Sequence, residues 1–263
     1  MYEPRPAPMP PFAQIRRPED MPPWTLPFSW RDTAFLAVYV GTLVLGLPVA
    51  ALLGILMAAG IRPDLKDPLT GALLQTGVYT LIVVAFCLLL WPDVRRAARR
   101  FTSRPGLAWG LIPAFWLGNV LILTAVGALM NLVDPNLSES ANQQGLADLA
   151  KKVPFPIMAV STVVFAPLVE EYVFRNVLLG KLSRVMSQWI ALPVSAVAFT
   201  VLHALAGWPD NPLTLLPYLV MGLNFGLIYI LSGKSFLSSA LVHGLHNLMA
   251  LSLLYVAPTS LPT

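Results

Sequence analysis

The chain has 263 residues, of which 56% are hydrophobic and only 11% are charged. Soluble globular domains carry about 25% charged residues, so this composition excludes a soluble globular protein and indicates a membrane protein. The net charge of +4 does not indicate a nucleic-acid partner, because the basic residues cluster between apolar runs, where they set membrane topology.

Residues 1–30 form a tail that holds nine of the 25 prolines and no apolar run. A secretory signal peptide would need a hydrophobic core after a basic start, so this segment is not one. Proline-rich segments without apolar residues favour an extended chain that does not pack. We predict a disordered cytoplasmic tail over 1–30, with a docking segment for a partner as the alternative.

Seven apolar runs of spanning length follow the tail, since a membrane-spanning helix needs about 20 such residues. They cover 32–60, 67–91, 107–133, 154–180, 188–206, 213–232 and 235–257. No strand-like alternation indicates a β-barrel. The predicted fold is therefore an all-α, polytopic transmembrane helix bundle with about seven spans. We divide it into N-terminal helices with an outer loop over 31–153, a motif-bearing core over 154–257, and a short tail over 258–263.

The distribution of lysine and arginine predicts the orientation of the bundle. With the N-terminus inside, twelve basic residues fall in inner segments and four fall in outer segments. The positive-inside rule therefore favours an N-in, C-out topology, with the RRAARR block of residues 95–100 inside. The loop 134–152 then lies outside and is long enough for a short helix that caps the bundle. We expect an integral, multi-pass protein of a bacterial inner membrane.

The fourth apolar run carries charged residues that a lipid-facing helix would avoid. Glu170, Glu171 and Arg175 interrupt it in the sequence PLVEEYVFR. Each such group costs about 2.5–3.5 kcal/mol at the centre of a spanning helix. A structural ion pair between Glu171 and Arg175, four residues apart, would explain one glutamate and leave Glu170 without a role. Pro167 lacks an amide N–H, so we expect it to kink the helix and help to form a polar cavity.

The three histidines, His203, His243 and His246, also lie inside predicted spans. His203 taken alone would most often be a packing residue. His243 and Asn247 are four residues apart, so their side chains project in nearly the same direction. His246 points elsewhere, either to support the others or toward another helix. Every deeply placed ionisable residue is thus expected in the runs 154–180, 188–206 and 235–257.

These residue types together indicate a hydrolase of amides or esters. A buried carboxylate near an arginine can act as a general base on water. Histidine and an asparagine amide can donate hydrogen bonds to a developing oxyanion. No HExxH zinc motif is present. His203, His243 and a glutamate are nevertheless a permissible set of zinc ligands, so use of a divalent metal stays open.

Three motifs follow one another in the second half of the chain: EExxxR at residues 170–175, FxxxH at 199–203 and HxxxN at 243–247. In this order, inside apolar runs, they resemble the CPBP family, which includes CAAX proteases and bacteriocin-processing proteins. The resemblance covers about residues 154–257.

The resemblance implies an intramembrane glutamic endopeptidase that acts on a membrane-associated peptide or protein and needs no cofactor. It implies that Glu170 activates water, assisted by His203, and that His243 and Asn247 form the oxyanion hole. It further implies that Glu171 and Arg175 shape and polarise the site, with Arg175 near the substrate carboxylate.

Two other classes of function remain open from the sequence. The first is a proton-coupled transporter, because intramembrane Glu, Arg and His also line proton relays. The first three spans carry no matching charge or helix break, which argues against the inverted repeats of many carriers. The second is a non-catalytic assembly or immunity partner with the same fold. A GxxxG pattern at Gly222 and Gly226 is expected to allow close helix contact inside the bundle rather than dimerisation.

Overall fold

A computed structural model describes residues 27–103, 105–205 and 207–256, which form helices and loops without a β-strand. The predicted all-α fold is therefore confirmed for this part of the chain. Residues 1–26 of the predicted N-terminal tail and the predicted tail 258–263 lie outside the described residues.

The first half of the chain contains one π-helical and five α-helical elements. These are α1 (Trp30–Tyr39), the π-helix η1 (Val40–Val44), α2 (Leu47–Ala58), α3 (Pro68–Ser103), α4 (Pro105–Val133) and α5 (Ala141–Ala150). The second half carries the three motifs. Its elements are α6 (Phe155–Ala159), the π-helices η2 (Val160–Phe165) and η3 (Tyr172–Lys181), α7 (Ala166–Glu171), the 3₁₀ turns η4 (Leu182–Arg184) and η5 (Pro212–Leu215), α8 (Gln188–Ala204), α9 (Leu216–Leu231) and α10 (Phe236–Val256).

Five helical segments among the described residues are long and apolar enough to cross a membrane. They are Pro68–Ser103, Trp109–Val133, Phe155–Arg184, Pro212–Leu231 and Phe236–Val256. The segment Trp30–Ala58 is a sixth only if its two helices, bent by 60°, count as one span. α8 is apolar but has only 17 residues. The chain is thus a multi-pass helical membrane protein, while the count of seven spans stays a prediction.

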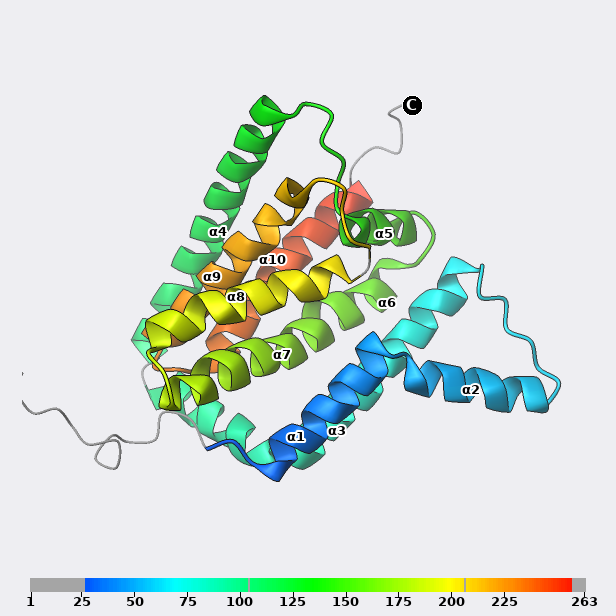
Figure 1. Cartoon of the computed structure of the whole chain (residues 1–263), viewed down its shortest axis with the longest axis horizontal. Helices are drawn as coiled ribbons and strands as arrows, with labels where there is room; N and C mark the ends of the chain where they lie inside the picture. The colour runs from blue at the N-terminus through cyan, green and yellow to red at the C-terminus, as the bar shows by residue number, and fades with distance from the viewer. Residues whose placement is uncertain (1–26, 104, 206, 257–263) are drawn as a thin grey trace, which may run out of the picture.

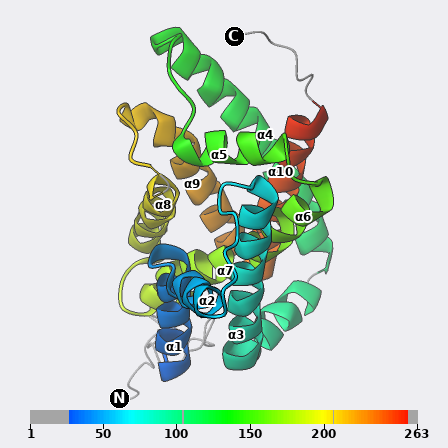
Figure 2. The same cartoon turned by 90° about the vertical axis from the view of Figure 1, so that its right-hand side faces the viewer.

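The motif-bearing helices lie in the middle of the bundle (Figure 1). α8 packs against η3 and α9, and α10 packs against α7, α9 and α4. α3 contacts α7, η2 and α10 from the other side. Figure 2 shows α5 lying across one end of the bundle, where it contacts α10, α8 and α3. This is the predicted short helix of the loop 134–152.

Short polar residues start several of these helices. The Asp67 carboxylate accepts hydrogen bonds from the amide and hydroxyl of Thr70, at 2.9 and 2.8 Å, before α3. The Ser140 hydroxyl accepts from the amide of Gln143 before α5. The Ser187 hydroxyl accepts from the amide of Trp189 before α8. Such caps satisfy amide groups that have no partner inside the first turn, and so fix where each helix begins.

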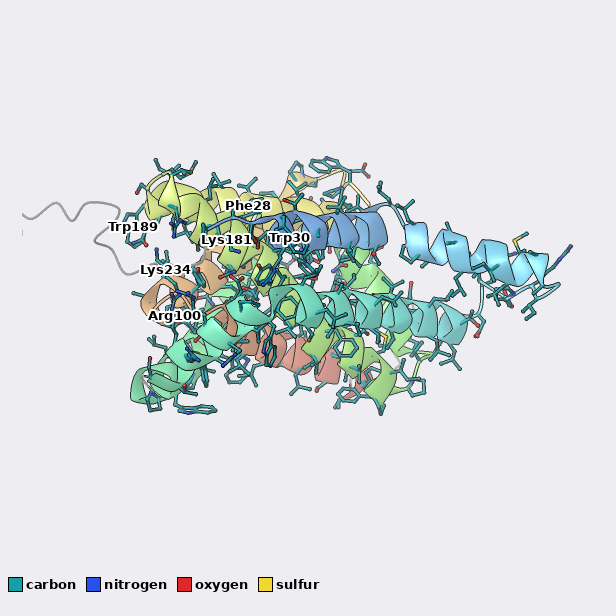
Figure 3. All side chains as sticks on the ribbon, turned by 90° about the horizontal axis from the view of Figure 1, so that it is seen from below. Phe28, Trp30, Arg100, Lys181, Trp189 and Lys234 are labelled. Atoms are coloured by element: carbon teal, nitrogen blue, oxygen red, sulfur yellow. The ribbon has the colours of Figure 1, made fainter. Side chains whose placement is uncertain are left out.

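The helix α3 continues well past the predicted end at residue 91. It runs through Pro92 and the RRAARR block to Ser103. The four arginines therefore lie on a helix rather than in a loop, which agrees with the high helix propensity of arginine and alanine. Figure 3 shows Arg100, Lys181 and Lys234 at the end of the bundle where α1 begins and α3 ends. The sequence predicts that this end faces the cytoplasm.

A buried polar cluster joins the first helix to the fourth apolar run. Lys181 Nζ lies 2.5 Å from Asp32 Oδ1 and 3.3 Å from Asp93 Oδ1. The Tyr172 hydroxyl donates to Asp32 at 2.6 Å, and Asn176 Nδ2 donates to Asp93 at 3.0 Å. Asp32 has no exposed surface. Because Asp32 lies in the first turn of α1, at the end of its segment, its burial does not contradict the expectation that ionisable residues in the middle of spans occur only in three later runs.

The run that carries Glu170 and Glu171 alternates between α-helical and π-helical turns. η2 ends just before Pro167, and η3 begins just after Glu171. The amide of Ala166 bonds to the carbonyl of Ser161, five residues back. The missing amide of Pro167 is thus accommodated by a switch from α-helical to π-helical hydrogen bonding. The segment Phe155–Arg184 remains one continuous helical segment of 30 residues. Such π-helical turns are frequent at functional sites.

Gly222 and Gly226 lie where α9 meets α8. A Cβ atom on Gly222 would lie 2.9 Å from Cα of Ala196, and one on Gly226 would lie 2.3 Å from Cδ1 of Leu192. The predicted role of this GxxxG pattern in close contact within the bundle is confirmed.

Gly222→Ala is expected to lower the thermal unfolding midpoint, because its new methyl group would press on the backbone of Ala196. Overpacking of this kind costs about 1–3 kcal/mol. Thermal unfolding in detergent measures the effect. Gly118→Ala in α4 is the matched control, since a Cβ there meets nothing within 4 Å. Equal midpoints for both variants would contradict the packing argument.

Candidate active site

One cavity inside the bundle collects four of the six predicted site residues. It measures about 140 Å³, and Glu170, His203, His243 and Asn247 line it from α7, α8 and α10. A water molecule needs only about 10–15 Å³ of such space and polar partners, and both are present here. The three motifs therefore meet at one hollow that can hold several waters.

Glu170 and Glu171 are neighbours in sequence but have different surroundings. Successive helical residues project about 100° apart, so the two side chains cannot face the same space. Glu170 lines the cavity, where its carboxylate interacts with the side chain of Tyr79 from α3. Glu171 is fully buried and does not line the cavity. The structure thus separates a carboxylate that can reach water from one that cannot.

Glu171 lies between His243 and Arg175. Its Oε1 is 3.0 Å from Nδ1 of His243, and its Oε2 is 2.9 Å from Nε of Arg175. The predicted ion pair between Glu171 and Arg175 is therefore present. Because a carboxylate accepts, Nδ1 of His243 donates to it, and the ring is held in one orientation with Nε2 free to act in the cavity.

Arg175 is fully buried behind the cavity wall, not in it. Its guanidinium lies 4.8 Å from the ring centroid of Phe199 and 5.5 Å from that of Phe225, and Nη2 donates to the carbonyl of Gly222 at 3.4 Å. Phe199 lines the cavity and lies next to the guanidinium. The role of Arg175 near the substrate carboxylate stays a prediction. The place of Arg175 beside Glu171 fits its predicted polarising role.

His203 is held in the cavity wall by its own helix and by Tyr218. Its Nδ1 lies 2.9 Å from the carbonyl of Phe199, which can only accept, so Nδ1 carries the proton of the neutral ring and Nε2 keeps its lone pair. The ring stacks on Tyr218 of α9 at 4.5 Å. The Tyr218 hydroxyl lies 2.8 Å from Ser140 Oγ and accepts from Asn142 Nδ2 at 3.3 Å. The cap helix α5 thus contacts a residue that orients His203.

Asn247 is oriented by the π-helical turn η2. Its Nδ2 donates to the carbonyl of Thr162 at 2.8 Å, which leaves the second amide hydrogen for a ligand. The approach of α10 to η2 depends on Gly244, where a Cβ would lie 2.8 Å from the carbonyl oxygen of Val163. Carbonyl groups of η2 thus position the helix that carries His243 and Asn247.

Comparison with protein-family models supports the resemblance that the motifs predict. Residues 152–249 match the family described as type II CAAX prenyl endopeptidase Rce1-like. That segment contains all six predicted site residues. Over this segment the chain resembles the CPBP family, as its three motifs predict.

Three curated bacterial proteins resemble this chain. Over 147 residues it is 31% identical to the membrane-embedded CAAX protease MroQ of Staphylococcus aureus, covering 52% of this chain and 56% of the relative. Over 145 residues it is 27% identical to the UPF0177 protein YxdF of Lactococcus lactis, covering 53% and 76%. Over 91 residues it is 34% identical to the putative membrane peptidase YdiL of Bacillus subtilis, covering 35% and 34%. No solved structure matches the chain.

The cavity is also lined by polar residues that the sequence analysis did not single out. They are Gln75, Tyr79, Asn142, Gln143, Thr162 and Tyr218. Gln75 is the only residue with an amide side chain in the run 67–91. This is the one feature of the sequence that could have marked it as a cavity residue. Tyr79 and Tyr218 have apolar bodies suited to membrane helices, so their presence in spans attracts no attention.

A metal site would require several ligands close together. Across the described ranges, no group of three His, Cys, Asp or Glu side chains is placed to hold a metal ion. Glu171, which could have joined His203 and His243 in a zinc site, is instead paired with Arg175.

Proposed function

We propose that this chain is an intramembrane endopeptidase that hydrolyses a peptide bond of a membrane-associated peptide or protein with a glutamate-activated water. The observation that carries the proposal is the single cavity lined by Glu170, His203, His243 and Asn247. The names of two relatives, a membrane-embedded CAAX protease and a putative membrane peptidase, support the same class of reaction. The bacterial relatives also support a location in a bacterial inner membrane.

The reaction begins with a water held between Glu170 and His203. Glu170 takes a proton from the water as its oxygen forms a bond with the scissile carbonyl carbon. Nε2 of His203 accepts a hydrogen bond from the same water. This bond directs the lone pair of the water oxygen at the scissile carbonyl carbon. The C–N bond then breaks as Glu170 returns the proton to the leaving amine. No covalent bond forms between the protein and the substrate at any step.

The oxyanion of the tetrahedral intermediate is stabilised by His243 and Asn247. Asn247 donates its second amide hydrogen, since Thr162 takes the first. His243 donates from Nε2 when both ring nitrogens carry protons, and the Glu171 carboxylate at 3.0 Å is the counter-charge. Removal of one oxyanion donor in other hydrolases costs about 10²–10³-fold in kcat.

A randomised peptide library tests the proposal. The purified protein, in detergent and in liposomes, is incubated with the library, and products are identified by mass spectrometry beside a Glu170→Ala control. Cleavage by the wild type and not by the variant supports the proposal. Equal cleavage by both excludes Glu170 as the base, and flux of protons or solutes through the liposomes without cleavage would favour a transporter.

Chelation is expected to leave peptide cleavage unchanged, because every group in the proposed mechanism is a side chain of this chain. The measurement is kcat before and after dialysis against EDTA, with a zinc peptidase as the control for complete chelation. Loss of activity that added zinc restores would contradict a metal-free mechanism.

A further inference from the structure

A second, larger cavity adjoins the catalytic one. It measures about 480 Å³ and is lined by the end of α4, the loop 134–140 and α9. Four residues line both cavities: Gln143, Tyr218, Met221 and His246. Ligand sites in proteins measure about 300–1,000 Å³, so this volume can hold a short segment of a peptide. A peptide whose scissile bond lies at Glu170 could therefore continue past His246 into this space.

His246 presents a fixed hydrogen-bond donor at the junction of the two cavities. Its Nδ1 lies 3.2 Å from Nδ2 of Asn119, an amide nitrogen that can only donate. Nδ1 therefore accepts, and the neutral ring carries its proton on Nε2. Asn119 is itself oriented, because its Oδ1 accepts from Nδ2 of Asn224 at 3.2 Å. Among the described residues, Nε2 of His246 has no hydrogen-bond partner, so it is left for a ligand.

The outer part of the second cavity is acidic. Asp134 and Glu139 line it, and no lysine or arginine is among its described lining residues. Among the described residues, the carboxylate of Asp134 accepts a hydrogen bond only from the amide of Asn136 in its own loop, at 3.1 Å, and Glu139 is exposed. A cationic side chain beside these carboxylates would gain attraction that salt weakens.

We propose that the second cavity binds the substrate segment that flanks the scissile bond. His246 Nε2–H donates to a backbone carbonyl of that segment, while Asp134 and Glu139 favour a lysine or arginine side chain. The inference rests on the proposed peptidase function and adds a substrate class, namely peptides with a basic residue close to the cleavage site. The segment enters from the side of the loop 134–140.

Binding to the Glu170→Gln variant tests the charge preference without turnover. The probes are two fluorescein-labelled octapeptides that differ only by lysine or glutamate at the flanking position, measured by fluorescence anisotropy. The lysine peptide is expected to bind more tightly. Asp134→Asn with Glu139→Gln should weaken its binding by about two- to thirtyfold and remove the salt dependence, because this change removes two exposed charge pairs. Asp148→Asn is the matched control, because Asp148 pairs with Lys151 and lies outside both cavities.

The role of His246 is tested in the same background. His246→Ala should weaken both peptides by about two- to tenfold, the usual net worth of one hydrogen bond. His246→Gln, whose amide can donate from a similar position, should restore most of the binding, which a purely structural role would not predict. Failure of glutamine to restore binding, with both variants folded, would overturn the donor role.

The outcomes separate this inference from the proposed function. Charge-selective binding that Asp134 and Glu139 control, without any cleavage by the wild type, would leave the binding site standing and reject the peptidase. Cleavage that depends on Glu170 but shows no preference for basic peptides would reject the binding site and leave the peptidase standing. An equal effect of Asp148→Asn would also overturn the assignment.

Discussion

Glu170→Gln is expected to lower kcat for peptide cleavage by about 10²–10⁴-fold, the usual contribution of a general base. Glutamine has nearly the same shape but cannot accept a proton from water. The side chain lines a cavity and forms no ion pair within the part of the chain that the structure describes, so the fold should persist. Steady-state cleavage and thermal unfolding of the same preparation measure the two effects.

The comparison variant for this prediction is Asp148→Asn, which removes an exposed carboxylate on α5 that lines neither cavity. Its kcat should match that of the wild type. Glu170→Gln with undiminished kcat would assign the base to another group. A large fall in thermal stability would instead show that Glu170 holds the bundle together.

Glu171→Ala is expected to destabilise the protein by about 3–5 kcal/mol, the cost of leaving a buried charge without its partner. Arg175 would keep its aromatic neighbours, Phe199 and Phe225, but would lose the one carboxylate that pairs with it among the described residues. His243 would also lose the carboxylate that fixes its ring. The free energy of unfolding, measured in denaturant, and kcat should therefore both fall, whereas Glu170→Gln should lower kcat alone.

A double variant, Glu171→Leu with Arg175→Met, separates these two losses. Replacing a buried ion pair by apolar side chains of similar size is often neutral or stabilising, so stability should return toward the wild-type value. Activity should stay low, because His243 still lacks its partner. Recovery of both quantities together would mean that Glu171 serves stability alone.

The motif helices could be predicted from the sequence because their geometry is local. Residues four apart share a helix face, which correctly paired Glu171 with Arg175 and brought His243 and Asn247 to one cavity. The same angular argument left Glu170 without an ion-pair partner, and the structure gives it a place in the cavity wall. Helical periodicity thus decided which side chains could meet within one segment.

Contacts between distant segments could not be predicted in this way. Asp32 looked like a helix-start residue near the membrane surface, because its partner Lys181 is far away in sequence. The helix-capping pattern of Ser29 with Asp32 is present as well, so one carboxylate performs both roles. Tyr79 and Tyr218 enter the cavity only because α3 and α9 pack beside α7 and α8. The π-helical turns were missed, since their five-residue hydrogen bonds leave no simple pattern of apolar residues.

The cluster of Asp32, Asp93 and Lys181 has a consequence for any attempt to shorten the protein. The family match begins at residue 152, yet the end of the glutamate-bearing segment is anchored to carboxylates from α1 and α3. A fragment restricted to residues 152–249 would expose an unmatched ammonium group to lipid and would lose Gln75 and Tyr79 from its cavity. The segment that matches the family model is thus not self-contained, because residues from the first part of the chain complete both its ion pairs and its cavity.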